Sequence, residues 1–228
     1  MREILLATFW ELLLNLFFPL QCVICGKLLA ADNKDRVCVE CWSKIVYFNR
    51  PIEIRLSLEM IWSVAVYDGV LRELIHQFKY KEKKYLAHLL GKLLVDFVEK
   101  YLKEERFDYV VPIPLEKARQ KKRGYNQAEL LGRVLGDAVN KPVLTDLVKR
   151  RKKTKPQFGL DREERFENLS GAFEMSKSGE EDVATIVGKT VLLLDDLATT
   201  GATLDECARV LKTAGVSEVY ALVLAHGM

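Results

Sequence analysis

The 228-residue sequence has little net charge, few histidines and no internal repeat. Its 35 Lys and Arg against 32 Asp and Glu leave a net charge of +3, which is too small to indicate a nucleic-acid-binding protein by itself. The histidines are far apart and no nucleophilic triad is recognisable, so a covalent mechanism based on one is not expected. We expect each histidine to be structural or to lie at the surface: His76, His88 and His226.

The sequence also lacks an apolar run long enough to span a membrane. Its most apolar segment, residues 4–18, is shorter than the ~20 residues that a span requires, and Glu11 interrupts it. No small-residue cleavage site precedes Cys22, so we expect no signal peptide and a cytoplasmic protein. The segment is expected to form a helix that packs on the residues after it or on another chain, as in an oligomer. Binding to a membrane surface is less favoured, because the polar side of this helix is not rich in Lys and Arg; any membrane association would come from partners.

Four of the five cysteines occur as two Cys-x-x-Cys pairs, twelve residues apart. Two such pairs can complete a tetrahedron of sulfurs, which is the coordination of a structural zinc site with no open position. Two disulfides are less favoured without an export signal, and a redox pair would be expected in a βαβ context that this segment does not have. The predicted zinc ligands are Cys22, Cys25, Cys38 and Cys41. The fifth cysteine, Cys207, is expected to be a small buried apolar residue.

Length and composition fit two units of unequal size. With 49% hydrophobic and 29% charged residues, the sequence is that of a soluble globular protein and excludes broad disorder. We expect residues 1–50 to contain the apolar helix and the four-cysteine segment, here called the zinc module. A single α/β domain is expected over residues 51–228.

The most informative segment is Val191–Thr203. Four apolar residues, 191–194, predict a buried strand of a parallel sheet, and Asp195 and Asp196 follow at its expected end. A loop of small residues then leads into a helix predicted over residues 203–215. Backbone N–H groups at a helix start bind phosphate, whereas two adjacent carboxylates accept hydrogen bonds from vicinal hydroxyls. The segment therefore predicts a site for a sugar phosphate.

This segment resembles the signature of type I phosphoribosyltransferases, which bind 5-phosphoribosyl-1-pyrophosphate (PRPP). The resemblance implies that Asp195 and Asp196 contact the ribose hydroxyls and that the loop after them binds the 5′-phosphate. The implied phosphate-binding residues are Ala198, Thr199, Thr200, Gly201, Ala202 and Thr203. One residue departs from the enzymes that act on 6-oxopurines, which have an aspartate base where this sequence has Thr199. Because threonine cannot abstract a proton at neutral pH, that class of acceptor is disfavoured.

The rest of the sequence alternates strands with helices. Strands are expected at residues 60–67, 108–111, 143–148, 172–175 and 219–225, and helices at residues 70–78, 84–102 and 126–139. This alternation predicts an α/β fold with a parallel sheet, helices on both faces, and ligand-binding loops at the carboxyl ends of the strands. Two basic clusters, at residues 117–123 and 149–155, are expected in loops.

Two of the predicted loops resemble substrate loops of the phosphoribosyltransferases. The loop over residues 112–127 stands where these proteins receive pyrophosphate, and the guanidinium groups of Arg119 and Arg123 fit its oxygens. For any single lysine of this loop, a solvated surface position is at least as well supported. The charged segment 151–171 resembles the flexible loop that closes over substrate, excludes water and brings positive charge to the departing pyrophosphate.

Several motifs occur in the order found in the ComF family. They are the apolar helix ending in Leu-Phe-Phe-Pro, the four cysteines, Val-Pro-Ile-Pro-Leu, Arg-Gly-Tyr-Asn-Gln-Ala-Glu-Leu-Leu, Lys-Pro-Gln-Phe-Gly-Leu and the Asp-Asp loop. The sequence is therefore similar to the ComF family over nearly its whole length. The resemblance implies a phosphoribosyltransferase fold preceded by a small zinc-ribbon-like module. It also implies a link to the uptake of single-stranded DNA in natural transformation.

Two functions remain open at this point. The first is transfer of a phosphoribosyl group from PRPP to a nitrogen nucleophile with release of pyrophosphate, for which Mg2+ is expected and Asp195, Asp196 and Arg123 are the expected catalytic residues. The second is a non-catalytic adaptor that binds a nucleotide or single-stranded DNA in the same site. Its zinc module would then dock on a competence helicase or a DNA-processing protein. For this second function, bases are expected to stack on Tyr125 and Phe158 beside the basic loops.

Overall fold

The computed structural model describes residues 19–33, 35–48, 51–52, 57–81, 83–102, 106–151, 164, 168–176 and 184–227. The helix predicted over residues 4–18 lies outside this part of the chain. So does most of the segment predicted to close over substrate, including Phe158. Of the helices in the described ranges, none is both long and apolar enough to cross a membrane.

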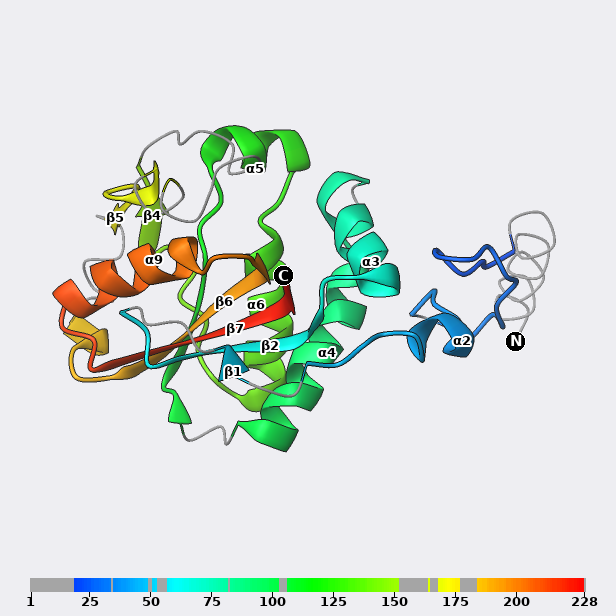
Figure 1. Cartoon of the computed structure of the whole chain (residues 1–228), viewed down its shortest axis with the longest axis horizontal. Helices are drawn as coiled ribbons and strands as arrows, with labels where there is room; N and C mark the ends of the chain where they lie inside the picture. Colours follow the sequence, from blue (N-terminus) through cyan, green and yellow to red (C-terminus); the bar gives the residue numbers. More distant parts are fainter. Residues whose placement is uncertain are drawn as a thin grey trace, which may run out of the picture.

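The main sheet has five strands in the order β1-β2-β7-β6-β3 (Figure 1). Four of them are parallel: β2 (Met60–Val66), β7 (Glu218–His226), β6 (Thr190–Ala198) and β3 (Tyr109–Pro112). A short strand, β1 (Pro51–Ile52), pairs antiparallel with β2 at the edge. Because the parallel strands point the same way, their carboxyl ends meet at one edge of the sheet, as the sequence predicted.

Helices cover both faces of this sheet, which confirms the predicted layers (Figure 1). On one face lie α4 (Leu86–Tyr101) and α6 (Gln127–Val139), with α3 (Gly69–Tyr80) beside α4. On the other face lies α9 (Ala202–Thr213), in which Cys207 is fully buried, as expected. The apolar residues of β6 alternate between the two cores, because successive side chains of a strand point to opposite faces. The strand is therefore apolar throughout its first half.

The first basic cluster is helical, whereas the sequence predicted a loop. Residues 117–123 form α5 (Lys117–Arg123), which ends at Gly124 in the left-handed conformation with φ 75°. None of the residues of α5 is buried. The helix therefore has no apolar face, and hydrophobic periodicity could not reveal it.

The two weaker strands predicted at residues 143–148 and 172–175 do not extend the main sheet as expected. The first contributes only an isolated bridge at Val143. Instead, β4 (Val148–Arg150) and β5 (Phe173–Met175) pair antiparallel as a separate two-stranded sheet in contact with α9. The second basic cluster thus begins in a strand rather than in the loop that was predicted. Three-residue strands are too short for their alternation to be recognised in sequence.

The zinc module packs directly on the helices of the first face. Its buried residues belong to the same apolar cluster as the buried sides of α3 and α4; they are Cys22, Val37, Cys38, Cys41 and Ile45. Two polar contacts strengthen this junction. Lys92 of α4 pairs with Asp35 at 3.3 Å, and the guanidinium of Arg36 lies over the ring of Tyr85, 4.9 Å from its centroid.

Candidate functional site

The four cysteines predicted as zinc ligands converge. Their sulfur atoms lie within 4.8 Å of one another, and the sulfurs of Cys25 and Cys38 are 3.7 Å apart. Four thiolates around zinc, each at ~2.3 Å, would have their sulfurs roughly 3.8 Å apart. The residues therefore fit a tetrahedral zinc ion. Because the cysteines supply all four ligands, the role of the zinc is structural.

Different local structures present the two cysteine pairs. The first pair lies in a tight turn in which Gly26 has φ 74° and donates its N–H to the carbonyl of Cys22 (2.9 Å). In the second pair, Cys38 is the N-cap of α2 (Val39–Trp42) and Cys41 lies within this helix; the Cys38 sulfur accepts from the N–H of Cys41 (3.4 Å). The spacing of the cysteines alone did not distinguish the turn of the first pair from the helix of the second. Residues three apart on a helix face the same side, which suits two ligands of one ion.

The surroundings of the four cysteines shift the pKa values of two of their thiols. Burial by itself raises the pKa of the Cys22 thiol, but backbone N–H donors from Cys25, Cys38 and Ile24 outweigh it and lower the pKa to about 6. Burial and the neighbouring thiols raise the pKa of Cys41 to about 12. The thiolate of Cys22 is thus favoured before a metal binds, whereas zinc must displace the proton of Cys41.

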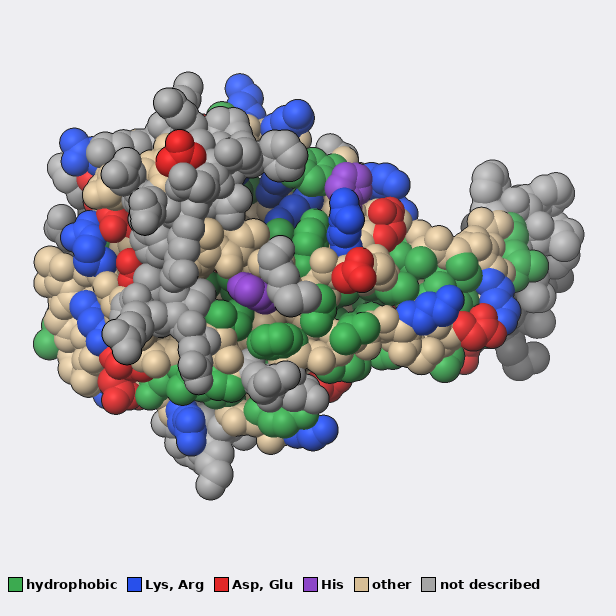
Figure 2. Space-filling view, in the orientation of Figure 1, with side chains coloured by type: hydrophobic (Ala, Val, Ile, Leu, Met, Phe, Trp, Pro, Cys, Tyr) green, Lys and Arg blue, Asp and Glu red, His purple; other side chains and the backbone are tan. Residues whose placement is uncertain are grey.

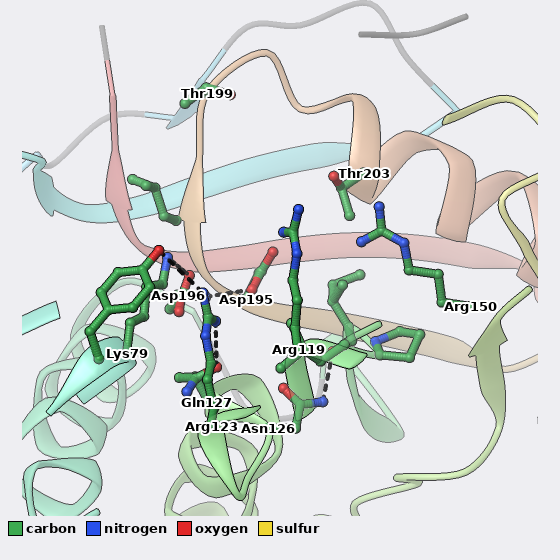
Figure 3. A pocket seen from close by; sticks show the side chains of 15 residues that line it. Lys79, Arg119, Arg123, Asn126, Gln127, Arg150, Asp195, Asp196, Thr199 and Thr203 are labelled. Atoms are coloured by element: carbon green, nitrogen blue, oxygen red, sulfur yellow. Dashed lines mark hydrogen bonds and ion pairs between the residues drawn. The ribbon is translucent and has the colours of Figure 1, made fainter. Parts of the chain in front are cut away.

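A second site lies at the carboxyl edge of the main sheet, in a cavity of about 220 Å3 (Figure 3). The charged and hydroxyl side chains that line it are Lys79, Tyr80, Arg119, Arg123, Arg150, Asp195, Asp196, Thr199 and Thr203. They come from α3, α5, β4, β6, the segment between β6 and α9, and the start of α9, and these elements are far apart in the sequence. Four cationic groups face two carboxylates, so the cavity favours an anion that also carries hydroxyl groups.

The acidic pair lies within β6, whereas the sequence placed it just after the strand. The strand continues to Ala198, and Asp195 is in register with Val223 of β7. The backbone N–H of Asp196 donates to Oδ1 of Asp195 (2.8 Å). Because successive residues of a strand face opposite sides, Asp196 lies toward α3 and Asp195 toward α9. Both carboxylates nevertheless line the cavity.

Lys79 of α3 is the partner of Asp196, and sequence analysis did not identify it. Its Nζ lies 2.8 Å from Oδ1 of Asp196, and the two side chains are only 16% and 7% exposed. Burial lowers the pKa of Lys79, but the carboxylates of Asp196 and Asp195 outweigh this effect and the net pKa is raised. The one sequence signal is a lysine directly after the buried Phe78 in a helix. It says nothing about a partner so distant in the chain.

Asp195 lies in a different environment from its neighbour. Its burial, reinforced by the negative charge of Asp196, raises the pKa of Asp195 to about 7. The charges of Lys79 and Arg150 oppose this shift without cancelling it. Asp195 is therefore partly protonated near neutral pH.

The loop predicted to hold phosphate connects β6 to α9. Gly201, at φ 77°, is the residue before α9, and the N–H of Ala202 donates to the hydroxyl of Thr200 (3.4 Å). A small cavity of about 20 Å3 is enclosed by Asp195 and residues 197–204. The amides at the start of α9 lie around this space, which is the arrangement that binds phosphate at helix starts.

The end of β7 supports this loop. Nε2 of His226 lies 3.0 Å from the carbonyl oxygen of Thr199, and the N–H of Gly227 donates to the carbonyl of Ala198 (2.9 Å). His226 is thus structural, as the sequence suggested. These contacts fix the first two residues of the loop against the sheet.

Helix α5 directs its two arginines, but not its lysines, into the cavity. Arg119 and Arg123 are one turn apart and both line it, whereas Lys117, Lys121 and Lys122 are exposed. Nη1 of Arg123 donates to Oε1 of Gln127 (3.0 Å) and Nη2 donates to the Tyr80 hydroxyl (3.3 Å). Nε of Arg119 lies 3.5 Å from Oε2 of Glu116.

Arg150, at the end of β4, is a further residue that sequence analysis did not single out. Its guanidinium lies over the ring of Phe173, 5.4 Å from the centroid. Burial lowers its pKa, and the nearby charge of Arg119 lowers it further. Like charges that converge on one cavity are the signature of a site for an anion.

The structure contradicts the expectation that Tyr125 stacks on bases. Its side chain is only 7% exposed, its hydroxyl donates to the carbonyl of Phe78, and the two rings are 5.6 Å apart. The exposed aromatic residue at this edge is instead Tyr80, at 60%. Phe158, the other residue expected to stack, lies outside the described residues.

Comparison with known proteins gives two family matches and several relatives. A model of the phosphoribosyl transferase domain matches residues 121–228, and a model of the double zinc ribbon domain matches residues 13–56. Competence protein F of Haemophilus influenzae is 32% identical over 229 residues, which cover 92% of this chain and 98% of that protein. DNA utilization protein YhgH of Escherichia coli is 27% identical over 205 residues (87% and 86%). Competence protein ComFC of Bacillus subtilis is 29% identical over 196 residues (85% and 72%).

Proposed function

The chain belongs to the ComF family, and from this premise we propose that it binds PRPP or a closely related ribose phosphate in the cavity at the carboxyl edge of the sheet. The observation that carries the proposal is the convergence of two carboxylates, four cationic groups and a phosphate-type loop on one cavity. The names of the relatives refer to competence and DNA utilization, so we place this binding in the handling of DNA taken up by the cell.

Each part of the cavity suits one part of PRPP. Asp195 and Asp196 accept hydrogen bonds from the ribose hydroxyls, and residues 198–203 bind the 5′-phosphate with backbone N–H and threonine hydroxyl groups. Arg119 and Arg123 bind the pyrophosphate, because guanidinium groups match its oxygens in pairs. The ligand would then span from α9 to α5 across the end of β6.

The reaction that such a site supports is attack by a nitrogen nucleophile at ribose C1 with departure of pyrophosphate. The residues of the chain would hold the sugar, orient its C1 toward the acceptor and stabilise the charge of the leaving group. Mg2+ bound with PRPP would supply further neutralisation of the pyrophosphate oxygens. The loop carries Thr199 where a base for 6-oxopurines would stand, so the acceptor is of another class.

Calorimetric titration of the zinc-loaded protein with PRPP and Mg2+ tests the proposal. We expect saturable binding that weakens at least tenfold in Asp195→Asn and is unchanged in Asp137→Asn, which alters an exposed acid on α6. Release of pyrophosphate in the presence of candidate nitrogen acceptors would then establish catalysis. No saturable binding to the folded wild-type protein at millimolar PRPP would refute the proposal.

A second function, binding of single-stranded DNA, is favoured by the surface beside the cavity. Tyr80 is 60% exposed with the guanidinium of Arg123 over its ring at 4.9 Å. Figure 2 shows Lys and Arg side chains over α5 and around α3. An exposed aromatic ring within positive charge suits bases and phosphates of a single strand. Binding that falls steeply with salt, is lost in Tyr80→Ala and survives Asp195→Asn would support this function over the first.

A further inference from the structure

Three consecutive residues at the end of α3 contact three different parts of the molecule. Gln77 Nε2 donates to the carbonyl of Val23, between the first two zinc ligands (2.9 Å). The carbonyl of Phe78 accepts from the hydroxyl of Tyr125, just after α5. Lys79 pairs with Asp196 in the cavity at 2.8 Å. The last turn of this helix therefore contacts the zinc module, the chain just after α5 and the acidic pair.

The contact between Gln77 and the zinc module requires that the module is folded. Gln77 is only 3% exposed, and its two amide atoms are used within the junction: Nε2 also donates to Glu73 (2.7 Å), and Oε1 accepts from Lys83 (2.6 Å). The N–H of Val23 donates to the carbonyl of Arg36, which ties the first cysteine pair to the chain leading into the second. Small four-cysteine modules owe their folding to the metal, so the carbonyl that Gln77 binds is positioned only when zinc is held.

The contact with the acidic pair sets the charge that a ligand meets. Lys79 provides the positive charge next to two adjacent carboxylates in a mostly buried site. If the end of α3 shifts, the ammonium leaves and the pair takes up a proton to reduce its repulsion. A protonated pair accepts fewer hydrogen bonds from hydroxyl groups.

We propose that the last turn of α3 couples zinc binding to ligand binding, with Gln77 as the anchor on the zinc module and Lys79 as the residue that positions Asp196. The proposal rests on the proposed function, because the ligand concerned is the ribose phosphate. Coupling of this kind is reciprocal: if zinc strengthens the binding of PRPP by some factor, PRPP strengthens the binding of zinc by the same factor. The zinc module is then an internal support of the sugar-phosphate site.

The test measures both sides of the coupling in the full-length, zinc-loaded protein. Titration with PRPP and Mg2+ gives the ligand affinity, and transfer of zinc to a chromophoric chelator, with and without PRPP, gives the rate of zinc release. Gln77→Met removes the anchor but leaves Lys79 and the acidic pair in place. Lys81→Met is the matched control, since it removes a cation just beyond the same helix end, whose Nζ lies 3.7 Å from Oε1 of Glu73, and leaves the contact between Gln77 and Val23 in place. Asp195→Asn controls for direct chelation of zinc by PRPP.

We expect PRPP to slow zinc release by about fivefold or more in the wild-type and Lys81→Met proteins, within the range typical of coupled sites. In Gln77→Met, PRPP should bind at least fivefold more weakly and should no longer slow zinc release, while circular dichroism shows a folded chain. An unchanged PRPP affinity and an unchanged protective effect in Gln77→Met would overturn the coupling alone. Absence of PRPP binding to the wild-type protein would overturn the proposed function together with it.

Discussion

Asp195 and Asp196 are joined by a hydrogen bond from the backbone N–H of one to the carboxylate of the other, but their side chains have different partners. Asp196 pairs with Lys79 at 2.8 Å, whereas burial and the charge of its neighbour raise the pKa of Asp195 to about 7. Near neutral pH the pair therefore holds part of a proton that a ligand can displace. This difference gives the cavity a titratable group in the physiological range.

Ligand affinity should depend on pH through Asp195. Ribose hydroxyls donate hydrogen bonds, so they favour the ionised carboxylate and should lower its pKa in the complex. We expect PRPP affinity to increase from pH 6 to pH 7 by up to about tenfold and to level off above pH 7. Titrations in two buffers of different ionisation enthalpy should show proton release near pH 6.5. The same titrations with Asp195→Asn should show neither the release nor the slope, and their persistence there would assign the proton to another group.

The raised pKa of Asp195 also predicts how the stability of the folded protein depends on pH. The folded-state pKa of Asp195 is raised above its ordinary value of 3.8, so its contribution to stability is present in full below pH 4 and is lost as the pH rises to about 7. Asp195→Asn should therefore gain stability over the wild-type protein by up to about 1.4 kcal/mol for each pH unit between pH 5.5 and 7. Urea unfolding of both proteins at matched pH measures the difference. A difference that shrinks as the pH rises would contradict the assignment.

Removal of Lys79 should destabilise the chain more than removal of both members of its ion pair. Lys79→Met leaves Asp196 in a site that is mostly buried, and an ionised group without its partner costs about 3 kcal/mol. Replacing Asp196 by Asn in the Lys79→Met background should recover part of this loss. The double-mutant cycle, measured by urea unfolding, should give a coupling free energy clearly above the error of about 0.5 kcal/mol. Strict additivity would show that the pair contributes nothing.

The two arginines of α5 should act on pyrophosphate and not on the sugar. Arg119→Ala and Arg123→Ala should each weaken PRPP binding by about tenfold or more, since a charge-assisted contact contributes about 1.5–3 kcal/mol. Ribose 5-phosphate, which lacks the pyrophosphate, should bind these variants almost as well as it binds the wild-type protein. Lys121→Ala, on the exposed side of the same helix, is the matched control. An equal loss of affinity for both ligands would show that the arginines do not act on the pyrophosphate group.

The protein should contain one zinc ion per chain, and its affinity for zinc should depend on pH. Protons compete for the thiolates, so zinc affinity should fall as the pH drops, by up to about tenfold per pH unit for each thiol that is protonated. Elemental analysis and chelator competition between pH 6 and 8 measure these quantities. Cys41→Ser should lose the metal, whereas Cys207→Ser, which alters a fully buried residue of α9, should keep it. Retention of zinc in Cys41→Ser would contradict the four-cysteine site.

The sequence predicted those parts of the fold whose signal is local. The strand β6, the helices α4, α6 and α9 and the four cysteines each have their pattern within a few turns or a few residues. The acidic pair was identified because ligand loops follow parallel strands. Helix α5 and the strands β4 and β5 were not, because the first has no apolar face and the others are three residues long.

The residues that complete the cavity could not be found from local patterns in the sequence. Lys79 and Arg150 belong to the site only because α3 and β4 bring them next to β6 in three dimensions. Their positions in the sequence resemble those of ordinary surface cations. Tyr125 was misassigned for the converse reason, since a tyrosine beside basic residues gives no sign that its ring is buried against Phe78.

The shared core of the zinc module with α3 and α4 bears on how the molecule can be divided. Cutting the chain near residue 51 would separate the zinc-module members of the shared apolar cluster, such as Val37 and Ile45, from its members in α3 and α4 and expose apolar surface to water. The resulting fragments would aggregate through this apolar surface. A fragment that is inactive in an assay would then show the effect of aggregation and not the absence of a functional residue. Point substitutions in the intact chain are therefore the sounder way to separate the tasks of its two halves.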